Sequence, residues 1–295
     1  MSAAGARLCL VDASLYIFRA WHSLPPDWRD AEGWPTHAAQ GYASFLLQVM
    51  EQLRPQQIAV CFDEALGRGF RHEIYPAYKA NRERPDEALL RQFAHCQAIT
   101  RHLGIPALAH PRFEADDLIG SLVTQARGQG QRVLLLSADK DLTQLLRAGD
   151  EQWDFGRDRR YTPETVVERF GVRPEQMADL LALSGDAIDN IPGVHGVGQL
   201  TAAKLLRHFG SLDALYQRLG EVAFLRIRGA KALHARLQEQ QAQARLSLQL
   251  TTIACDAPIP PPPDLQRRPA DLAGLNALFD QLGFGPFLRR RAAAL

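Results

Sequence analysis

Residues 133–139 read Val-Leu-Leu-Leu-Ser-Ala-Asp, a short apolar run that ends in an aspartate. Two earlier runs have the same form, Leu8-Cys-Leu-Val-Asp12 and Ile58-Ala-Val-Cys-Phe-Asp63. Continuous apolar runs of this length, rich in Val, Ile and Leu, are typical of strands that are buried on both faces of a parallel sheet. We therefore predict a mainly parallel central sheet that contains these three strands.

Amphipathic segments alternate with the apolar runs. Residues 38–53, 86–103 and 114–127 carry apolar side chains at helical spacing. Pro85, which two acids follow, is typical of a helix start, and Gly104 is typical of a helix end. This alternation predicts an α/β fold in which helices flank the sheet.

The pattern becomes helical from about Thr162. Helical segments are expected at 163–171, 174–186, 199–210, 211–220, 229–250 and 271–282. A glycine-rich hairpin at 191–198 separates two of them. We therefore predict an α/β core over residues 1–174 and a helical subdomain over 175–295, with the proline run at 258 and 260–263 as a rigid connector.

The composition is that of a globular protein, since 46% of the 295 residues are hydrophobic and 23% are charged. No apolar run is long enough for a membrane span, and the N-terminus lacks the features of a signal peptide, so we expect a cytoplasmic protein without a membrane partner. The 34 basic and 33 acidic residues give a net charge of +1. This overall balance does not indicate a nucleic-acid partner.

The cysteines are Cys9, Cys61, Cys96 and Cys255, and none of them stands in a CxxC spacing. We expect buried free thiols rather than a zinc site or a disulfide.

Carboxylates occupy positions that the predicted fold brings together. Parallel strands place their carboxyl ends along one edge of the sheet, where open α/β sheets hold their functional sites. The three predicted strands end in Asp, and further acids open the 114–127 helix, follow residue 139 and precede the hairpin. These nine residues are Asp12, Asp63, Glu114, Asp116, Asp117, Asp139, Asp141, Asp186 and Asp189. For the acids of 114–117, helix capping is the alternative role.

Nine convergent carboxylates need positive charge among them, because like charges raise each other's pKa. The set contains only oxygen ligands, which indicates Mg²⁺ or Mn²⁺ rather than zinc. Two such ions about 3.5 to 4 Å apart are the arrangement that serves phosphodiester hydrolysis. Without the nine acids, 24 of the 33 acidic residues stand against 34 basic ones, so the remaining chain is suited to nucleic acid.

A basic segment, residues 67–84, precedes the helix predicted from 86. It contains the cations Arg68, Arg71, Lys79, Arg82 and Arg84, with Phe70, Tyr75 and Tyr78 interleaved. Basic side chains pair with phosphates and aromatic rings stack on unpaired bases, so the mixture is suited to a single strand. A solvated loop of mixed charge is the alternative.

The hairpin Pro192-Gly-Val-His-Gly-Val-Gly198 is followed by a helix start. Gly193, Gly196 and Gly198 allow tight turns and close approach to a phosphate, and the N–H groups of the following helix N-terminus favour an anion. Lys204 lies one to two turns into that helix. A plain turn between helices is the alternative, and it explains one glycine better than three.

Motifs in a fixed order run along nearly the whole chain. They are Val11-Asp-Ala-Ser, Gly33-Trp-Pro-Thr36, Phe70-Arg-His-Glu, Tyr78-Lys-Ala-Asn-Arg82, Glu114-Ala-Asp-Asp117, Ala138-Asp-Lys-Asp-Leu142, Gln144-Leu-Leu, Gly185-Asp186, Asp189-Asn-Ile-Pro-Gly-Val194 and Gly196-Val-Gly198. In these motifs the chain resembles the 5'-nuclease domain of bacterial DNA polymerase I and its stand-alone relatives, within the flap endonuclease family. Ala13 and His195 stand where many relatives have Gly and Lys, and we expect His195 to weaken duplex binding near neutral pH.

The resemblance implies a site for two Mg²⁺ ions, with Mn²⁺ as a substitute. The residues that match the first-metal set are Asp12, Asp63, Glu114 and Asp116, with Asp117 nearby. The residues that match the second-metal set are Asp139, Asp141, Asp186 and Asp189.

The resemblance also implies how DNA is held. Tyr78, Lys79 and Arg82 match the base of a helical arch, over about 64–104, through which a single-stranded 5' end is threaded. Lys79 matches the basic residue at the scissile phosphate, and Arg71 matches a phosphate contact. The hairpin matches a helix-three-turn-helix that grips the duplex, often with K⁺ held by backbone carbonyls.

The function that the resemblance implies is a structure-specific 5' nuclease, both a 5'-3' exonuclease and a flap endonuclease, of replication or repair. Its substrates would be DNA flaps, nicks or single-stranded 5' ends, and we expect a monomer associated with the nucleoid. Two alternatives stay open. A single-strand ribonuclease of the related acidic-site fold would not need the hairpin, and a non-catalytic DNA-binding protein would not need the nine acids.

Overall fold

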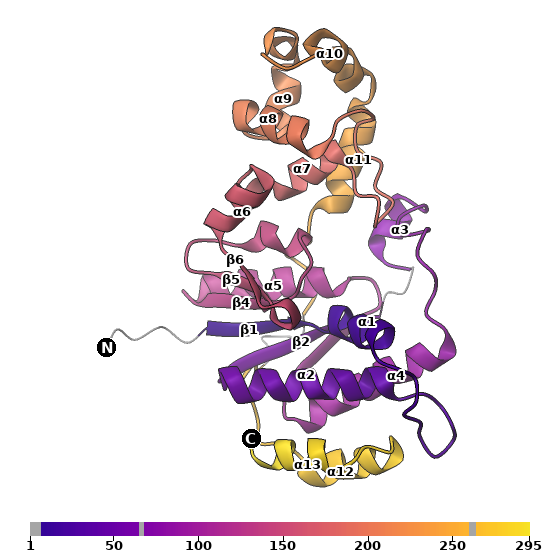
Figure 1. Cartoon of the computed structure of the whole chain (residues 1–295). Coiled ribbons are helices and arrows are strands. Elements are labelled where there is room, and N and C mark those ends of the chain that lie inside the picture. The colour runs from indigo at the N-terminus through magenta and orange to yellow at the C-terminus, as the bar shows by residue number, and fades with distance from the viewer. Residues whose placement is uncertain (1–6, 65–67, 260–263) are drawn as a thin grey trace. The chain divides into compact units, whose positions relative to one another are not determined.

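The computed structural model describes residues 7–64, 68–259 and 264–295 (Figure 1). Contacts divide the chain into two compact units. Unit 1 comprises the described parts of Met1–Leu66, Arg84–Ala138 and Cys255–Leu295, and unit 2 those of Gly67–Glu83 and Asp139–Ala254.

Unit 1 contains the parallel sheet that the apolar runs predict. Its strands are β1 (Arg7–Asp12), β2 (Gln57–Asp63), β3 (Ala107–His110) and β4 (Arg132–Leu136), in the order β3-β2-β1-β4. All neighbouring pairs are parallel, and in the register of β1 and β2 Asp12 lies opposite Cys61. The prediction of a mainly parallel sheet is confirmed, although β4 ends before Asp139 and the short, half-buried β3 was not predicted.

Helices of unit 1 pack on this sheet and on each other (Figure 1). They are α1 (Ala13–Ser23), α2 (His37–Leu53), α4 (Glu87–His102), α5 (Ala115–Gly128), α12 (Leu272–Gln281) and α13 (Pro286–Ala293). Helix α5 packs against β1 and β2, and α1 against α2 and β2. The expected helix start at 86 is confirmed, because the Asp86 carboxylate accepts the N–H of Leu89 at 2.8 Å. Helix α13 was not predicted.

Unit 2 is mostly helical, with one antiparallel strand pair, β5 (Glu151–Asp154) and β6 (Arg159–Tyr161). Its helices are α3 (Phe70–Ile74), α6 (Pro163–Phe170), α7 (Met177–Ser184), α8 (Gln199–Phe209), α9 (Leu212–Gln217), α10 (Ala230–Glu239) and α11 (Gln241–Thr251). Short 3-10 turns occupy Asp141–Leu145, Phe155–Arg157, Pro174–Gln176 and Leu219–Phe224. The strands β5 and β6 were not predicted, because they are short and lack an apolar run.

The single long helix expected over 229–250 is wrong. The chain breaks at Gln240 into α10 and α11, where the backbone has φ −103° and ψ 22°, and the Gln240 Oε1 accepts the N–H of His195 at 2.7 Å.

The two units consist of alternating segments of the chain rather than two consecutive halves, so they do not test a single boundary. The domain boundary near residue 174 therefore stays a prediction. The arch over about 64–104 also stays a prediction. Residues 65–67 of it, and residues 260–263 of the proline run, lie outside the described residues.

Three cysteines confirm the expectation of buried free thiols, namely Cys9, Cys61 and Cys96. Cys255 is also a free thiol, but the expected burial is wrong for it, because this residue lies in the irregular segment after α11 and is exposed. In the described part of the chain, no helix is both long and apolar enough to cross a bilayer.

Candidate active site

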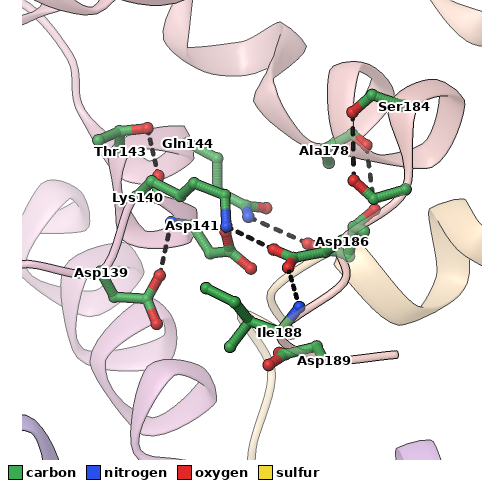
Figure 2. Close-up of polar contacts among 12 residues, drawn as sticks. Asp139, Lys140, Asp141, Thr143, Gln144, Ala178, Ser184, Asp186, Ile188 and Asp189 are labelled. Carbon is green, nitrogen blue, oxygen red and sulfur yellow. Dashed lines mark hydrogen bonds and ion pairs between the residues drawn. The ribbon is translucent and has the colours of Figure 1, made fainter. Parts of the chain in front are cut away.

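The carboxylates of Asp139, Asp141, Asp186 and Asp189 form one group in unit 2, named here the unit 2 carboxylates (Figure 2). Asp141 begins a 3-10 turn, and Asp186 and Asp189 lie on the loop that follows α7. The backbones of Asp186 and Ile191 exchange two hydrogen bonds, at 2.9 and 2.8 Å, which closes this loop. Residues 139–141 and 186–189, far apart in sequence, are thereby held by rigid turns.

Lys140 lies among these carboxylates (Figure 2). Its ammonium forms an ion pair with Oδ2 of Asp186 and lies 3.5 Å from Oδ1 of Asp141. Asp139 Oδ1 accepts the N–H of Asp141 at 2.9 Å, and Asp186 Oδ1 accepts the N–H of Ile188 at 2.8 Å. One ammonium is thus shared by two carboxylates at the centre of the group.

The unit 2 carboxylates are short of positive charge. Burial raises the pKa of Asp141 to about 7, and the neighbouring carboxylates of Asp139, Asp189 and Asp186 add to the shift against the opposing effect of Lys140. Burial also raises the pKa of Asp139, against the N–H of Asp141 and the charge of Lys140. Oδ1 of Asp141 is buried, and no described residue donates a hydrogen bond to it. A largely buried group of oxygen ligands in which negative charge is unfavourable suits a hard divalent cation.

The arrangement is not a ready-made coordination shell. Over the described ranges, no set of three or more His, Cys, Asp or Glu side chains is arranged to hold a metal ion. The donor chemistry of the unit 2 carboxylates therefore fits a metal, and their side chains would have to close around it.

The segment that carries the predicted arch residues docks on Asp189. The Tyr78 hydroxyl donates to Asp189 Oδ2 at 3.3 Å, Arg82 forms an ion pair with Oδ1, and the Lys79 ammonium lies 3.8 Å from Oδ2. The backbone N–H of Lys79 also donates to the carbonyl of Asp189 at 3.0 Å. One carboxylate of the group therefore holds the three predicted arch-base residues.

Two asparagines lock the same contact, and the sequence analysis did not single them out. Asn81 donates to the carbonyl of Ala187 at 2.8 Å, and Asn190 donates to the carbonyl of Ala77 at 2.6 Å. Lys79 and Asn190 both adopt a positive φ, 53° and 55°. The signal in the sequence was that each Asn stands next to a charged site residue, Asn81 before Arg82 and Asn190 after Asp189.

Arg71 has a structural role. Its side chain is 4% exposed, its Nε donates to the carbonyl of Leu250 at 2.8 Å, and its Nη2 donates to that of Thr252 at 2.9 Å. Tyr78 is 3% exposed and packs with Ile191 and Leu250. The burial of Arg71 argues against the predicted phosphate contact. Because Arg71 and Tyr78 are both buried, the segment is not a solvated loop.

In unit 1, the structure gathers the carboxylates of Asp12, Asp63 and Asp116 around one end of the sheet. Burial raises the pKa of Cys61, and these three carboxylates raise it further, because they lie near that buried thiol. Asp63 Oδ1 accepts the N–H of Ala115 at 2.7 Å, which joins the end of β2 to the start of α5. The predicted convergence of strand-end acids with the 114–117 segment is therefore present in unit 1.

Helix capping accounts for part of this group. Glu114 is the N-cap of α5, and Oδ2 of the fully buried Asp117 accepts its N–H at 3.0 Å. Asp12 accepts the N–H of Leu15 at 3.3 Å and the hydroxyl of Ser137 at 2.9 Å. Capping thus explains Asp117 well, but it does not explain why Asp116 also lies near Asp12 and Asp63.

The glycine hairpin of unit 2 is tightly packed at one end and open at the other. Gly193 has a φ of 61°, and a Cβ there would lie 2.2 Å from the backbone nitrogen of Gly185. Gly196 has a φ of 76°. Gly198 is the N-cap of α8, has a φ of −82°, and nothing lies within 4 Å of the place of a Cβ. The fold itself requires glycine at 193 and 196 but leaves the approach to Gly198 free.

Side chains of helix α11 form hydrogen bonds with the backbone of the hairpin. Ser247 Oγ accepts the N–H of Gly193 at 3.2 Å, and Gln243 donates to the carbonyl of Gly193 at 2.5 Å. Lys204 lies exposed on α8. A plain inter-helix turn does not require this bracing, so the geometry favours a rigid binding element.

Two family models match consecutive parts of the chain. Residues 7–171 match the 5'-3' exonuclease N-terminal resolvase-like domain, and residues 172–273 match the 5'-3' exonuclease C-terminal SAM fold. DNA polymerase I of Rhizobium leguminosarum is 38% identical over 262 residues, which cover 86% of this chain and 25% of that protein. DNA polymerase I of Pseudomonas aeruginosa is 43% identical over 252 residues, which cover 85% of this chain and 27% of that protein.

The chain thus spans about a quarter of the length of the curated relatives that it matches. Among solved structures, the bacteriophage T5 flap endonuclease in complex with DNA and metal ions is similar, with a TM-score of 0.68 and 22% identity. That alignment covers 98% of this chain and 97% of the T5 chain, and at this identity it supports the fold. With both domain models matched in order along residues 7–273, the chain belongs to the 5'-3' exonuclease family.

Proposed function

We propose that this protein is a structure-specific 5' nuclease that hydrolyses DNA phosphodiester bonds at 5' flaps, nicks and single-stranded 5' ends during replication or repair. Family membership supports a DNA nuclease. A monomer and a cytoplasmic, nucleoid-associated location stay predictions.

One observation carries the proposal. Asp189 belongs to a largely buried carboxylate group suited to a divalent cation, and the same carboxylate holds Lys79 and Arg82, which are suited to a phosphate. A phosphodiester hydrolase needs these two chemistries side by side, because the negative charge of the transition state must be stabilised. A non-catalytic DNA-binding protein needs only the second.

The proposed ligands of two Mg²⁺ ions, with Mn²⁺ as a substitute, follow the two groups. The first ion would use Asp12, Asp63, Glu114 and Asp116, with Asp117 capping the helix beside them, and the second would use Asp139, Asp141, Asp186 and Asp189. When bound, such ions stabilise charge on the attacking and leaving oxygens.

The chain's own cations have distinct proposed roles. The Lys79 side chain is 19% exposed and restrained by Asp189, so it would present its ammonium to the scissile phosphate without searching many rotamers. Arg82, which is 46% exposed, would bind the phosphates of the threaded 5' strand. Tyr78 is a positioning residue, because its hydroxyl orients Asp189.

The glycine hairpin would bind the duplex through backbone phosphates, so recognition would depend on DNA shape rather than sequence. Gly198 leaves the α8 N-terminus open to a phosphate, and Lys204 follows on the same helix. A K⁺ ion at the hairpin carbonyls is part of the same proposal.

The test is cleavage of a labelled 5'-flap duplex with Mg²⁺, beside single-stranded RNA. We expect the flap to be cut to a 5'-phosphate product, Asp139→Asn to be inactive, and Asp158→Asn, a carboxylate outside the group, to retain activity. Cutting of RNA with an intact flap would favour the ribonuclease alternative. An Asp139→Asn protein that cuts like wild type would refute the proposal.

Lys79 is tested by separating binding from turnover. We expect Lys79→Ala to bind the flap nearly as wild type and to cleave much more slowly in a single turnover. Weak binding with unchanged turnover would exclude the role at the scissile phosphate.

A further inference from the structure

Arg236 of α10 lies directly on the glycine hairpin. A Cβ placed on Gly196 would come within 2.8 Å of a terminal nitrogen of the Arg236 guanidinium and within 3.3 Å of its central carbon. One helical turn later, Gln240 accepts the N–H of His195. The last turn of α10 therefore faces the tip of the hairpin, and the absence of a side chain at 196 makes room for the guanidinium.

No carboxylate of the described residues pairs with the Arg236 guanidinium. Within the part of the chain that is described, its side chain forms no ion pair, and its Nε is buried without a hydrogen-bond acceptor. Arg236 is half-buried, and a buried N–H without an acceptor is unfavourable because it has lost its hydrogen bond to water. A ligand that supplies oxygen acceptors would remove this cost.

The hairpin contains no permanent cation of its own. Its sequence from Ile191 to Gly198 includes neither Lys nor Arg. The guanidinium of Arg236 therefore lies beside Gly196 in a hairpin that has neither Lys nor Arg of its own. Arginine presents its donors in a planar fork that matches two oxygens of a phosphate.

We propose that Arg236 is a phosphate-binding residue of the hairpin and pairs with a backbone phosphodiester of the bound duplex. The proposal rests on the proposed function, because it requires that the hairpin holds DNA. It adds α10 to the DNA-binding surface, and it assigns to Gly196 a second task besides its turn, namely to seat the guanidinium.

A phosphate contact has a measurable signature. Each neutralised phosphate of B-DNA releases counterions, so the slope of log K against log salt changes by about 0.9 per contact. Loss of one contact is therefore worth about eightfold in affinity near 0.1 M salt. A side chain that only packs against the hairpin would change the affinity without changing this slope.

The experiment measures binding of a short labelled blunt duplex in EDTA at several KCl concentrations. We expect Arg236→Gln to bind about eightfold more weakly near 0.1 M salt, with a slope that is lower by about 0.9. The charge-matched control is Arg157→Gln, an exposed arginine of the Phe155–Arg157 turn, which should change neither quantity. Arg236→Lys keeps the charge and should keep the slope while it loses part of the affinity.

Each other result overturns the inference. Equal affinity and slope for Arg236→Gln and Arg157→Gln exclude the contact, and weaker binding with an unchanged slope assigns Arg236 a packing role. If circular dichroism shows that Arg236→Gln does not fold, Arg236→Lys provides the test. A slope of log K against log salt that is lower in Arg236→Lys than in wild type would then exclude the phosphate contact. Wild-type protein that neither binds the duplex nor cuts a flap would instead refute the proposed function, so the two failures differ.

Discussion

Replacement of Lys140 by Gln should destabilise the metal-free protein, because its ammonium is the charge shared by Asp186 and Asp141. Burial alone lowers the pKa of Lys140, but these two carboxylates raise it above its ordinary value, which shows how strongly they favour the cation. In the variant the unit 2 carboxylates would repel each other with less compensation.

The magnitude follows from burial. Removal of one partner from a fully buried ion pair costs about 3–5 kcal/mol. The Lys140 side chain is 35% exposed, whereas that of Asp186 is 6% exposed, so solvent screens part of the loss. We expect a loss of about 1–3 kcal/mol in the free energy of unfolding.

The assay is urea unfolding with EDTA and with millimolar Mg²⁺, beside the exposed-lysine control Lys231→Gln. We expect Mg²⁺ to stabilise Lys140→Gln more than wild type, because an ion that binds only the folded state adds RT ln(1 + [L]/Kd) and would replace the missing charge. The reasoning would be refuted if Lys140→Gln were as stable in EDTA as Lys231→Gln. It would also be refuted if Mg²⁺ did not stabilise Lys140→Gln more than wild type.

Three further predictions concern stability. Gly193→Ala should destabilise by more than about 2 kcal/mol, because its Cβ would meet the Gly185 backbone, whereas Gly198→Ala should stay within about 0.5 kcal/mol; equal urea midpoints would contradict this. Arg71→Leu should cost about 2–4 kcal/mol in the same assay, since the buried carbonyl of Leu250 and the part-buried carbonyl of Thr252 lose their donor; a loss below about 0.5 kcal/mol would show that they are otherwise satisfied. Burial raises the pKa of Asp179 to about 6 from 3.8, so the folded state binds the extra proton and wild-type stability falls as pH rises through this window. Asp179→Asn should therefore match wild type near pH 3.8 and exceed it by about 1–3 kcal/mol above pH 6, and a constant difference across the window would exclude the titration.

Much of the site was predictable from local patterns. Apolar runs that end in Asp12 and Asp63 place these acids at the carboxyl ends of parallel strands, and the structure confirms the sheet and the contact of Asp63 with the α5 N-terminus. The helix period likewise predicted α2, α4 and α5 to within one or two residues. These features depend on neighbours in the sequence or on the geometry of a single sheet edge.

Other features escaped prediction because their causes lie far away in the sequence. At the break between α10 and α11, Gln240 contacts His195, 45 residues away, and Arg71 donates to carbonyls of α11 and the residue after it, 179 and 181 residues away. A basic residue in a mixed-charge segment carries no local sign that its guanidinium will bind backbone carbonyls rather than phosphate.

The amino-acid pattern alone therefore specifies the parallel sheet, the flanking helices and the identity of the acids, because strand and helix periods and strand-end positions are local properties. Tertiary structure decides how those acids and cations are used. It sets Tyr78 against Asp189 across 111 residues, places Lys140 among the carboxylates and lays Arg236 on Gly196. The physical reason is that burial and distance determine the strength of a charge interaction, and both arise only when remote segments pack.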